Sequence, residues 1–118
     1  LRPGEASTRH RHHEQVELYV LLEGLGRVRV DGDLLSLRPS DALAVEPPSV
    51  RQLFNDTTDD QLWLVVGAPP EPANTLEMSD QDLRWLYPDG PRALPPELER
   101  RVKDHASSPG VITRIPHL

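Results

Sequence analysis

The 118-residue sequence has no cysteine, a single lysine and no apolar run near the roughly 20 residues that a membrane-spanning helix needs. Without cysteine there are no disulfides, thiolate metal ligands or thiol nucleophiles. The missing apolar run, together with the absence of a signal-peptide pattern, predicts a cytoplasmic protein with no membrane partner. Neither a glycine-rich phosphate motif nor a nucleophile elbow is present, so the sequence does not support Ser-His-acid catalysis.

The charge is acidic, since 19 Asp and Glu residues against 13 Lys and Arg residues leave a formal net charge of −6. Phosphate binding favours a basic surface, so we expect no nucleic-acid partner. The length suits one domain with its own apolar core.

The first 67 residues have the pattern of a β-structure. Thirteen prolines argue against long helices. The pair Asp31-Gly32, between RVRV and LLSL, is a strong hairpin signal. Regularly spaced short strands predict an all-β sandwich or barrel over residues 1–67. The strands are expected at 7–12, 16–22, 26–31, 33–37, 42–46, 51–55 and 61–67.

The remainder, residues 68–118, has a different character. It opens with the proline-rich stretch APPEPANT, which cannot join the centre of a sheet. The segment 79–87 is predicted to form a short helix with Ser79 as its N-cap. A second short helix is predicted over 95–106, with a thin apolar stripe. We expect this tail to pack on the barrel or on a partner.

Three histidines lie within four positions of the stretch RHRHHEQVELYVLLEG. On a strand, His10 and His12 share one face, with His13 on the other. Two imidazoles at this spacing can chelate one ion, and Glu17, after a short turn, is placed to add a carboxylate. His10, His12 and Glu17 are therefore the candidate metal ligands.

Other interpretations of the histidines stay open. The stretch can be an unstructured leader, or a structured pocket that uses the imidazoles only as hydrogen-bonding groups. His13 and Glu14 are the local competitors, since a register shift of one residue would exchange the inward set.

The same spacing resembles the first motif of the cupin superfamily. Every fixed position of that motif is matched, by Gly4, His10, His12, Glu17 and Gly24. The resemblance implies a double-stranded β-helix, or jelly-roll barrel, with a short helical C-terminal tail. It also implies a divalent metal cofactor, which for these ligands is Fe, Mn, Ni or Zn.

The stretch LRPSDALAVEPPSVRQLFND resembles the second motif of the same superfamily. Pro39 matches the motif proline, Asp41 stands where glycine is usual, and Asn55 or Asp56 matches the closing asparagine. The histidine that this motif normally contributes to the metal falls at Gln52. The resemblance therefore leaves three protein ligands where the superfamily usually has four.

Several further residues are candidates for a substrate pocket. Tyr19 is expected to face inward one pleat after the glutamate ligand. Gln52 is expected to face inward, and Phe54 with it, while Arg51 points outward. In the other register Arg51 enters the pocket and can hold an anionic substrate bidentately. Trp63 is interpreted as a packing residue.

The outward face of the segment 16–22 is also apolar, which predicts burial on both faces. A second copy of the chain is the simplest cover, and small cupins commonly pair through their sheets, so a homodimer is expected. The tail helix around Trp85 is the alternative cover. The outward-facing residues are Val16, Leu18, Val20 and Leu22.

Three functions follow from these observations. The first is a metal-binding small cupin that acts as an oxygenase or isomerase on a small organic molecule. The second is a non-catalytic module that binds or senses a small molecule through a degenerate metal site. The third is a homodimeric structural domain whose tail contacts a partner.

Overall fold

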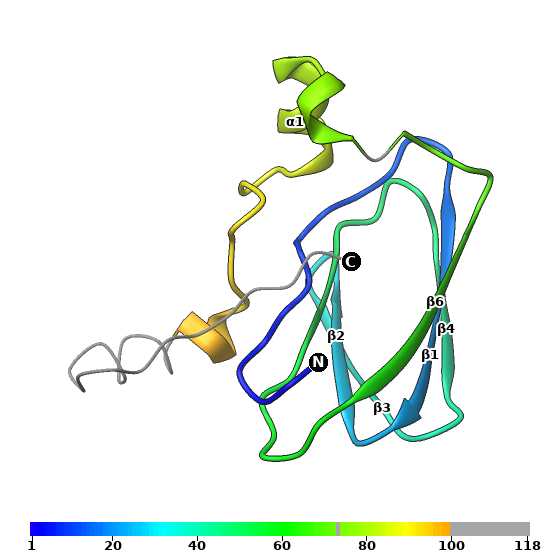
Figure 1. Ribbon diagram of the computed structural model, residues 1–118, viewed down its shortest axis with the longest axis vertical. Coiled ribbons are helices and arrows are strands. Elements are labelled where there is room, and N and C mark those ends of the chain that lie inside the picture. Colours follow the sequence, from blue (N-terminus) through cyan, green and yellow to red (C-terminus); the bar gives the residue numbers. More distant parts are fainter. Residues whose placement is uncertain (73, 100–118) are drawn as a thin grey trace.

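The computed structural model describes residues 1–72 and 74–99. Its strands form two antiparallel three-stranded sheets that face each other (Figure 1). The all-β prediction is confirmed, and six of the seven predicted strands are present. The first sheet, in the order β4-β1-β6, consists of Ala42–Val45, Val16–Glu23 and Leu62–Ala68. The second, in the order β3-β2-β5, consists of Asp33–Leu37, Gly26–Val30 and Arg51–Phe54.

The predicted strand 7–12 is wrong as a regular strand. This segment runs beside β5 but pairs with it only through isolated bridges, Ala6 with Phe54 and His10 with Arg51. Side chains interrupt the ladder between these bridges, because the Leu53 amide donates to the hydroxyl of Ser7. The segment therefore reaches the sheet in an extended form without the continuous pairing of a strand.

The core lies between the two sheets and follows the period of two along each strand. On β1, Tyr19 and Leu21 face inward and are almost completely buried. Leu53 does the same on β5. The inward side chains form one cluster of Tyr19, Leu21, Val28, Leu37, Val45 and Leu53.

Tight connections set the register of the strands. The predicted hairpin at Asp31-Gly32 is confirmed, since Val30 and Asp33 are paired partners on β2 and β3. Gly24, after β1, has a φ of +86°, and a Cβ there would lie 2.5 Å from the carbonyl oxygen of Asp60. Only glycine fits this position without strain.

The helix predicted over 79–87 is confirmed as α1, Asp80–Leu86, and a short 3-10 helix, Thr75–Glu77, precedes it. The Ser79 hydroxyl accepts from the backbone N–H of Asp82, as an N-cap should. Figure 1 shows α1 beyond one end of the two sheets. This is the end at which β1 begins.

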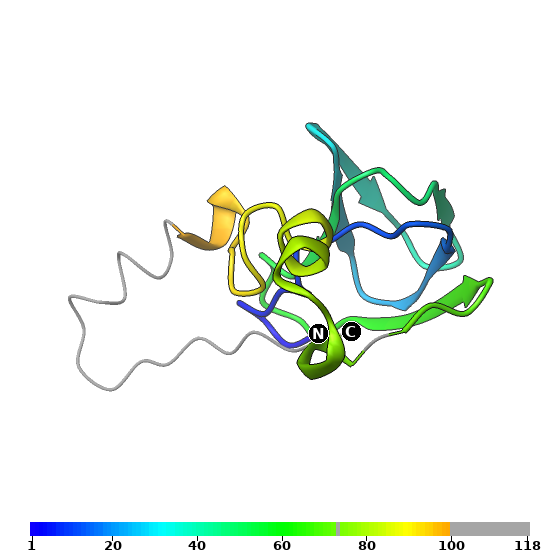
Figure 2. The same cartoon turned by 90° about the horizontal axis from the view of Figure 1, so that it is seen from above.

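The segment before and within the second predicted helix packs beside β5. Residues 96–99 are helical, and the rest of the predicted helix 95–106 lies outside the described residues. Leu98 is fully buried against Ala6 and Phe54, which form a second small apolar cluster. Figure 2 shows this segment, in orange, at the side of the N-terminal chain.

The outer face of the β4-β1-β6 sheet is apolar and exposed. Leu18 on β1 lies opposite Val66 on β6, and their exposed fractions are 39% and 50%. The alternative cover that the sequence left open, the helix around Trp85, is wrong, because Trp85 packs on Arg11 and His13. The other exposed apolar side chains on these two strands are Val16, Leu22, Leu62 and Leu64.

Across residues 1–72 and 74–99, none of the helices has the length and apolar character required to span a bilayer.

Candidate metal centre

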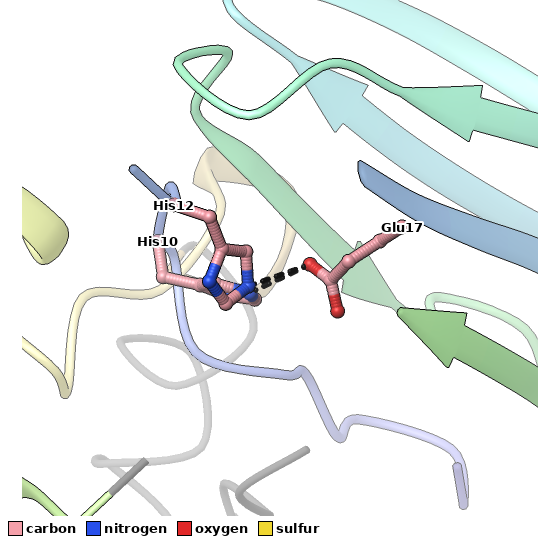
Figure 3. Close-up of side chains that lie close together, drawn as sticks. All are labelled: His10, His12 and Glu17. Carbon is pink, nitrogen blue, oxygen red and sulfur yellow. Dashed lines mark hydrogen bonds and ion pairs between the residues drawn. The ribbon is translucent and has the colours of Figure 1, made fainter. Parts of the chain in front are cut away.

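His10, His12 and Glu17 converge at the end of the sheets where β1 begins (Figure 3). One ligand atom from each residue lies within 4.8 Å of the others. The two imidazole Nε2 atoms lie 3.1 and 3.0 Å from the same oxygen, Oε1 of Glu17. The structure therefore brings together the three side chains that the histidine spacing predicts.

Backbone pairing with β5 holds His10 in place. Its N–H donates to the carbonyl of Arg51, and its own carbonyl accepts from the Arg51 N–H. The ring Nδ1 lies 3.0 Å from the backbone carbonyl of Thr8, which can only accept. A neutral ring with its proton on Nδ1 donates to Thr8 and leaves Nε2 free for an ion, whereas a proton on Nε2 is donated to Glu17.

His12 is held by two other segments. Its backbone N–H donates to the carbonyl of Pro47, and its Nδ1 lies 3.1 Å from Oε2 of Glu71. Glu71 and Glu17 both only accept, so the neutral His12 ring can donate to Glu71 from Nδ1 or to Glu17 from Nε2. Burial lowers the pKa of His12, but the hydrogen bond and charge of Glu17, with Glu71 beside the ring, raise it above the ordinary value overall.

Glu17 is the centre of the cluster, on the inward face of β1 and only 8% exposed. The Tyr19 hydroxyl donates to the same oxygen at 2.8 Å. Burial by itself raises the pKa of Glu17, but hydrogen bonds with His10, His12 and Tyr19 hold that pKa well below its usual range. Burial, together with the Glu17 charge, raises the pKa of Tyr19, so this hydroxyl stays a neutral donor.

The expected orientation of Gln52 is wrong by one residue. Arg51, not Gln52, faces the cluster, and the Arg51 Nε lies 3.7 Å from Oε1 of Glu17. Gln52 points to the other face of β5, where its amide donates to the backbone carbonyls of Ser7 and Ala93. Pairing with β2 sets this register, and a slip of one residue exchanges the faces of a strand.

Phe54 shares the face of Gln52 and packs in the second apolar cluster, so its predicted place in the pocket is wrong for the same reason. The sequence contained a sign of this difference. Either Asn55 or Asp56 matches the closing asparagine of the second motif, and the two matches correspond to registers of β5 that differ by one residue. The structure buries Asn55 completely, and its side chain donates to the carbonyls of Leu1 and Asp59.

The guanidinium of Arg51 is buried and tethered. Its side chain is 0% exposed, and its terminal nitrogens donate to the carbonyls of Val45, Glu46 and Pro47. Its Nε is buried without a hydrogen-bond partner. Burial lowers the pKa of Arg51, but a guanidinium keeps its charge at neutral pH.

The remaining candidates lie outside the cluster. His13 stacks on Trp85, with the ring centroids 4.1 Å apart, and half of its side chain is exposed. Glu14 is exposed and meets the site region only through its backbone N–H. Trp63 packs against the core, as predicted.

Glu71 is the site residue that sequence reasoning missed. It lies in the proline-rich stretch after β6 and accepts from His12 as well as from the backbone N–H groups of His13, Glu14 and Gln15. The sequence signal that could have indicated it is that Glu71 is the one charged residue of the stretch APPEPANT.

The donor set fits a divalent ion. Two nitrogens and a carboxylate oxygen are ligands that Fe, Mn, Ni and Zn accept. Neighbouring ligand atoms on such an ion, each about 2.1 Å from it, lie roughly 3 Å apart, which matches the two N–O distances of the cluster. Thr8 and Glu71 can accept the Nδ1 protons, which would leave both Nε2 lone pairs for the ion.

Comparison with known proteins supports this fold. The family description that matches residues 1–67 is that of the cupin domain. A structure from Thermus thermophilus is 33% identical, with a TM-score of 0.56, over 58% of this chain and 66% of that one. No curated protein matches the sequence.

Two further structures resemble the chain. A sugar phosphate isomerase of the cupin superfamily from Silicibacter pomeroyi is 33% identical, with a TM-score of 0.56, over 59% of this chain and 46% of that one. A cupin protein from Bacteroides fragilis is 25% identical, with a TM-score of 0.55, over 64% of this chain and 67% of that one.

The chain spans only 44–66% of the length of the first such structures, so the match concerns the barrel and not those whole proteins. Within the barrel, the two sheets have the double-stranded β-helix arrangement that the resemblance implied. The cupin domain matches residues 1–67, which are more than half of this chain, so the chain belongs to the cupin superfamily.

Proposed function

We propose that this cupin binds one divalent metal ion through His10, His12 and Glu17. The observation that carries the proposal is the convergence of the three side chains on one point. Both Nε2 atoms lie within 3.1 Å of Oε1 of Glu17, while Thr8 and Glu71 offer acceptors at the two Nδ1 positions.

Without metal, each imidazole can donate an Nε2–H to the Glu17 carboxylate. A divalent ion accepts from all three atoms at once, and the outer acceptors then orient the rings as they do around bound metals.

When bound, the ion supplies Lewis acidity to a small organic molecule at its open positions. The protein holds the ligand oxygen of Glu17 in place through the Tyr19 hydroxyl. The proposed reaction is of the isomerase or oxygenase type. Similarity to the sugar phosphate isomerase of Silicibacter pomeroyi favours the isomerase.

Arg51 supports a second candidate function, a non-catalytic module that binds a small molecule without metal. Its buried guanidinium lies 3.7 Å from Glu17 and neutralises the carboxylate charge that would otherwise attract a metal ion. In this function the histidines serve as hydrogen-bonding groups of a degenerate site.

Metal content separates the two candidates. The protein is purified without a histidine tag, loaded in turn with Fe, Mn, Ni or Zn, and desalted before the metal is measured by mass spectrometry. We expect about one ion per chain, lost in the double variant His10→Ala, His12→Ala. His13→Ala is the matched control, since His13 lies in the same stretch but outside the cluster, and it should keep the ion. A wild-type protein that retains none of the four metals would refute metal binding and leave the second candidate.

We also propose that a second copy of the chain covers the apolar face of the β4-β1-β6 sheet. Leu18, Leu64 and Val66 lie side by side there and are about 39–50% exposed. A two-fold axis would place this patch on its own copy, as in most homodimers. The mass of the protein in solution, measured by light scattering, tests this proposal.

A further inference from the structure

Glu71 lies just beyond the barrel that the cupin domain matches, yet its carboxylate enters the site region. Its side chain is only 11% exposed, although it belongs to a surface stretch that follows β6. Its partner His12 is 59 positions away in the sequence. A charged side chain that is buried needs compensating partners.

The carboxylate has four N–H partners. Oε2 accepts from Nδ1 of His12 at 3.1 Å and from the backbone N–H of His13 at 3.3 Å. Oε1 accepts from the backbone N–H groups of Glu14 and Gln15. These residues form the turn that joins the two histidine ligands to the glutamate ligand on β1.

A second contact ties the same turn to the same segment. The Gln15 side-chain amide donates to the carbonyl of Pro69 at 3.1 Å. The side chain also lies so close to Gly67 that a Cβ there would come within 2.5 Å of it. The turn is therefore seated against the chain that leaves β6.

We propose that Glu71 is a positioning residue for the metal centre, and that docking of residues 69–71 on the turn is coupled to metal binding. The inference rests on the proposed metal-binding function. Glu71 keeps the His12 proton on Nδ1 and fixes the ring plane, so that Nε2 is free to bind the ion. Groups in this outer position change metal affinity by about 10–100-fold when they are removed.

The coupling is reciprocal. If the Glu71 carboxylate strengthens metal binding by a given factor, the bound metal strengthens the contact between Glu71 and the turn by the same factor. Metal occupancy at the barrel end is thereby transmitted to the segment that leads to α1. The amides of Glu14 and Gln15 report this contact directly, since Glu71 is their acceptor.

The test uses the full chain and three variants. Glu71→Ala removes the acceptor, Glu71→Gln keeps an oxygen without the charge, and Glu77→Ala is a matched control on the exposed 3-10 helix. Titration with Zn(II) or Mn(II) should give a dissociation constant raised about 10–100-fold in Glu71→Ala, an intermediate value in Glu71→Gln and no change in Glu77→Ala. Circular dichroism of each variant confirms that the barrel is folded.

Two readouts do not depend on affinity alone. NMR of the imidazole nitrogens should show His12 with its proton on Nδ1 in the metal-free wild type and a mixture of tautomers in Glu71→Ala. Hydrogen exchange at Glu14 and Gln15 should slow on metal addition in the wild type and not in Glu71→Ala.

The possible failures are distinguishable. A wild type that binds no metal overturns the proposed function and this inference together. A Glu71→Ala variant with wild-type affinity and an unchanged His12 tautomer overturns the inference alone. Reduced affinity with an unchanged tautomer and unchanged exchange would also overturn it, because Glu71 would then act only through the general fold.

Discussion

The replacement Arg51→Met is the most informative perturbation of this site. Methionine has a similar length and fits a buried position, but it removes the cation that lies 3.7 Å from Glu17. Unit charges at that separation attract by about 4 kcal/mol at an effective dielectric constant near 20. Both partners are buried, so solvent screening reduces this value little.

Arg51→Met should lower the stability of the metal-free protein and strengthen metal binding. Removing one member of a buried ion pair costs about 3–5 kcal/mol, which for a domain of this size lowers the melting temperature by roughly 10–20 °C. In this variant a bound divalent ion would neutralise Glu17 in place of the guanidinium. The repulsion between Arg51 and the ion would also be gone. We therefore expect metal affinity to rise by about one to two orders of magnitude, corresponding to about 1.4–2.8 kcal/mol.

The assay is thermal unfolding with a chelator and with excess Zn(II) or Mn(II), followed by calorimetric titration. Arg29→Met is the matched control: Arg29 is paired with Glu97, and its position on β2 lies opposite Gln52, on the face away from the cluster. The control should be less stable but keep wild-type metal affinity. If Arg51→Met binds metal no more tightly than Arg29→Met does, the competition between Arg51 and the metal is refuted.

The remaining predictions concern the site, the dimer and the fold. Because the pKa of His12 is raised, a proton competes with the metal below that pKa. Metal affinity measured from about pH 8 down to about pH 5 should fall by about tenfold per pH unit below the raised pKa, and a flat profile would contradict metal binding through His12. The raised pKa also means that His12 stabilises the metal-free fold at low pH, and this contribution is lost as pH rises through that pKa. The gain in melting temperature on metal addition should therefore grow with pH. Leu64→Glu places a charge on the exposed sheet face and should give a monomer by light scattering with unchanged circular dichroism, and a persistent dimer would exclude this face. Gly24→Ala should lower the free energy of unfolding in urea by roughly 1–3 kcal/mol, because of its positive φ and the nearby Asp60 carbonyl, whereas Gly32→Ala, with open space around it, should change little.

Much of the fold follows from local patterns in the sequence. The period-two alternation of β1 predicts the inward faces of Tyr19 and Leu21, and the Asp31-Gly32 pair predicts the hairpin that the structure contains. The segment around His10 was harder to predict. Whether it forms a ladder depends on β5, where the Leu53 N–H donates to the Ser7 hydroxyl and not to a backbone carbonyl.

The candidate ligands were also predictable, and the reason is again local. His10 and His12 are two residues apart and share one face of an extended chain, and the short turn after them brings Glu17 beside them. The sequence by itself thus determined the strand pattern and the three side chains that meet at the site.

Only the tertiary structure decided what surrounds them. The choice between Arg51 and Gln52 depends on how β5 pairs with β2, and a change of one residue in that pairing exchanges the two faces. The role of Glu71 depends on a contact across 59 positions, made by a proline-rich segment with no periodic pattern. Residue spacing predicts which neighbours lie on the same face of one strand, whereas the cation beside Glu17 and the carboxylate behind His12 result from packing between distant segments.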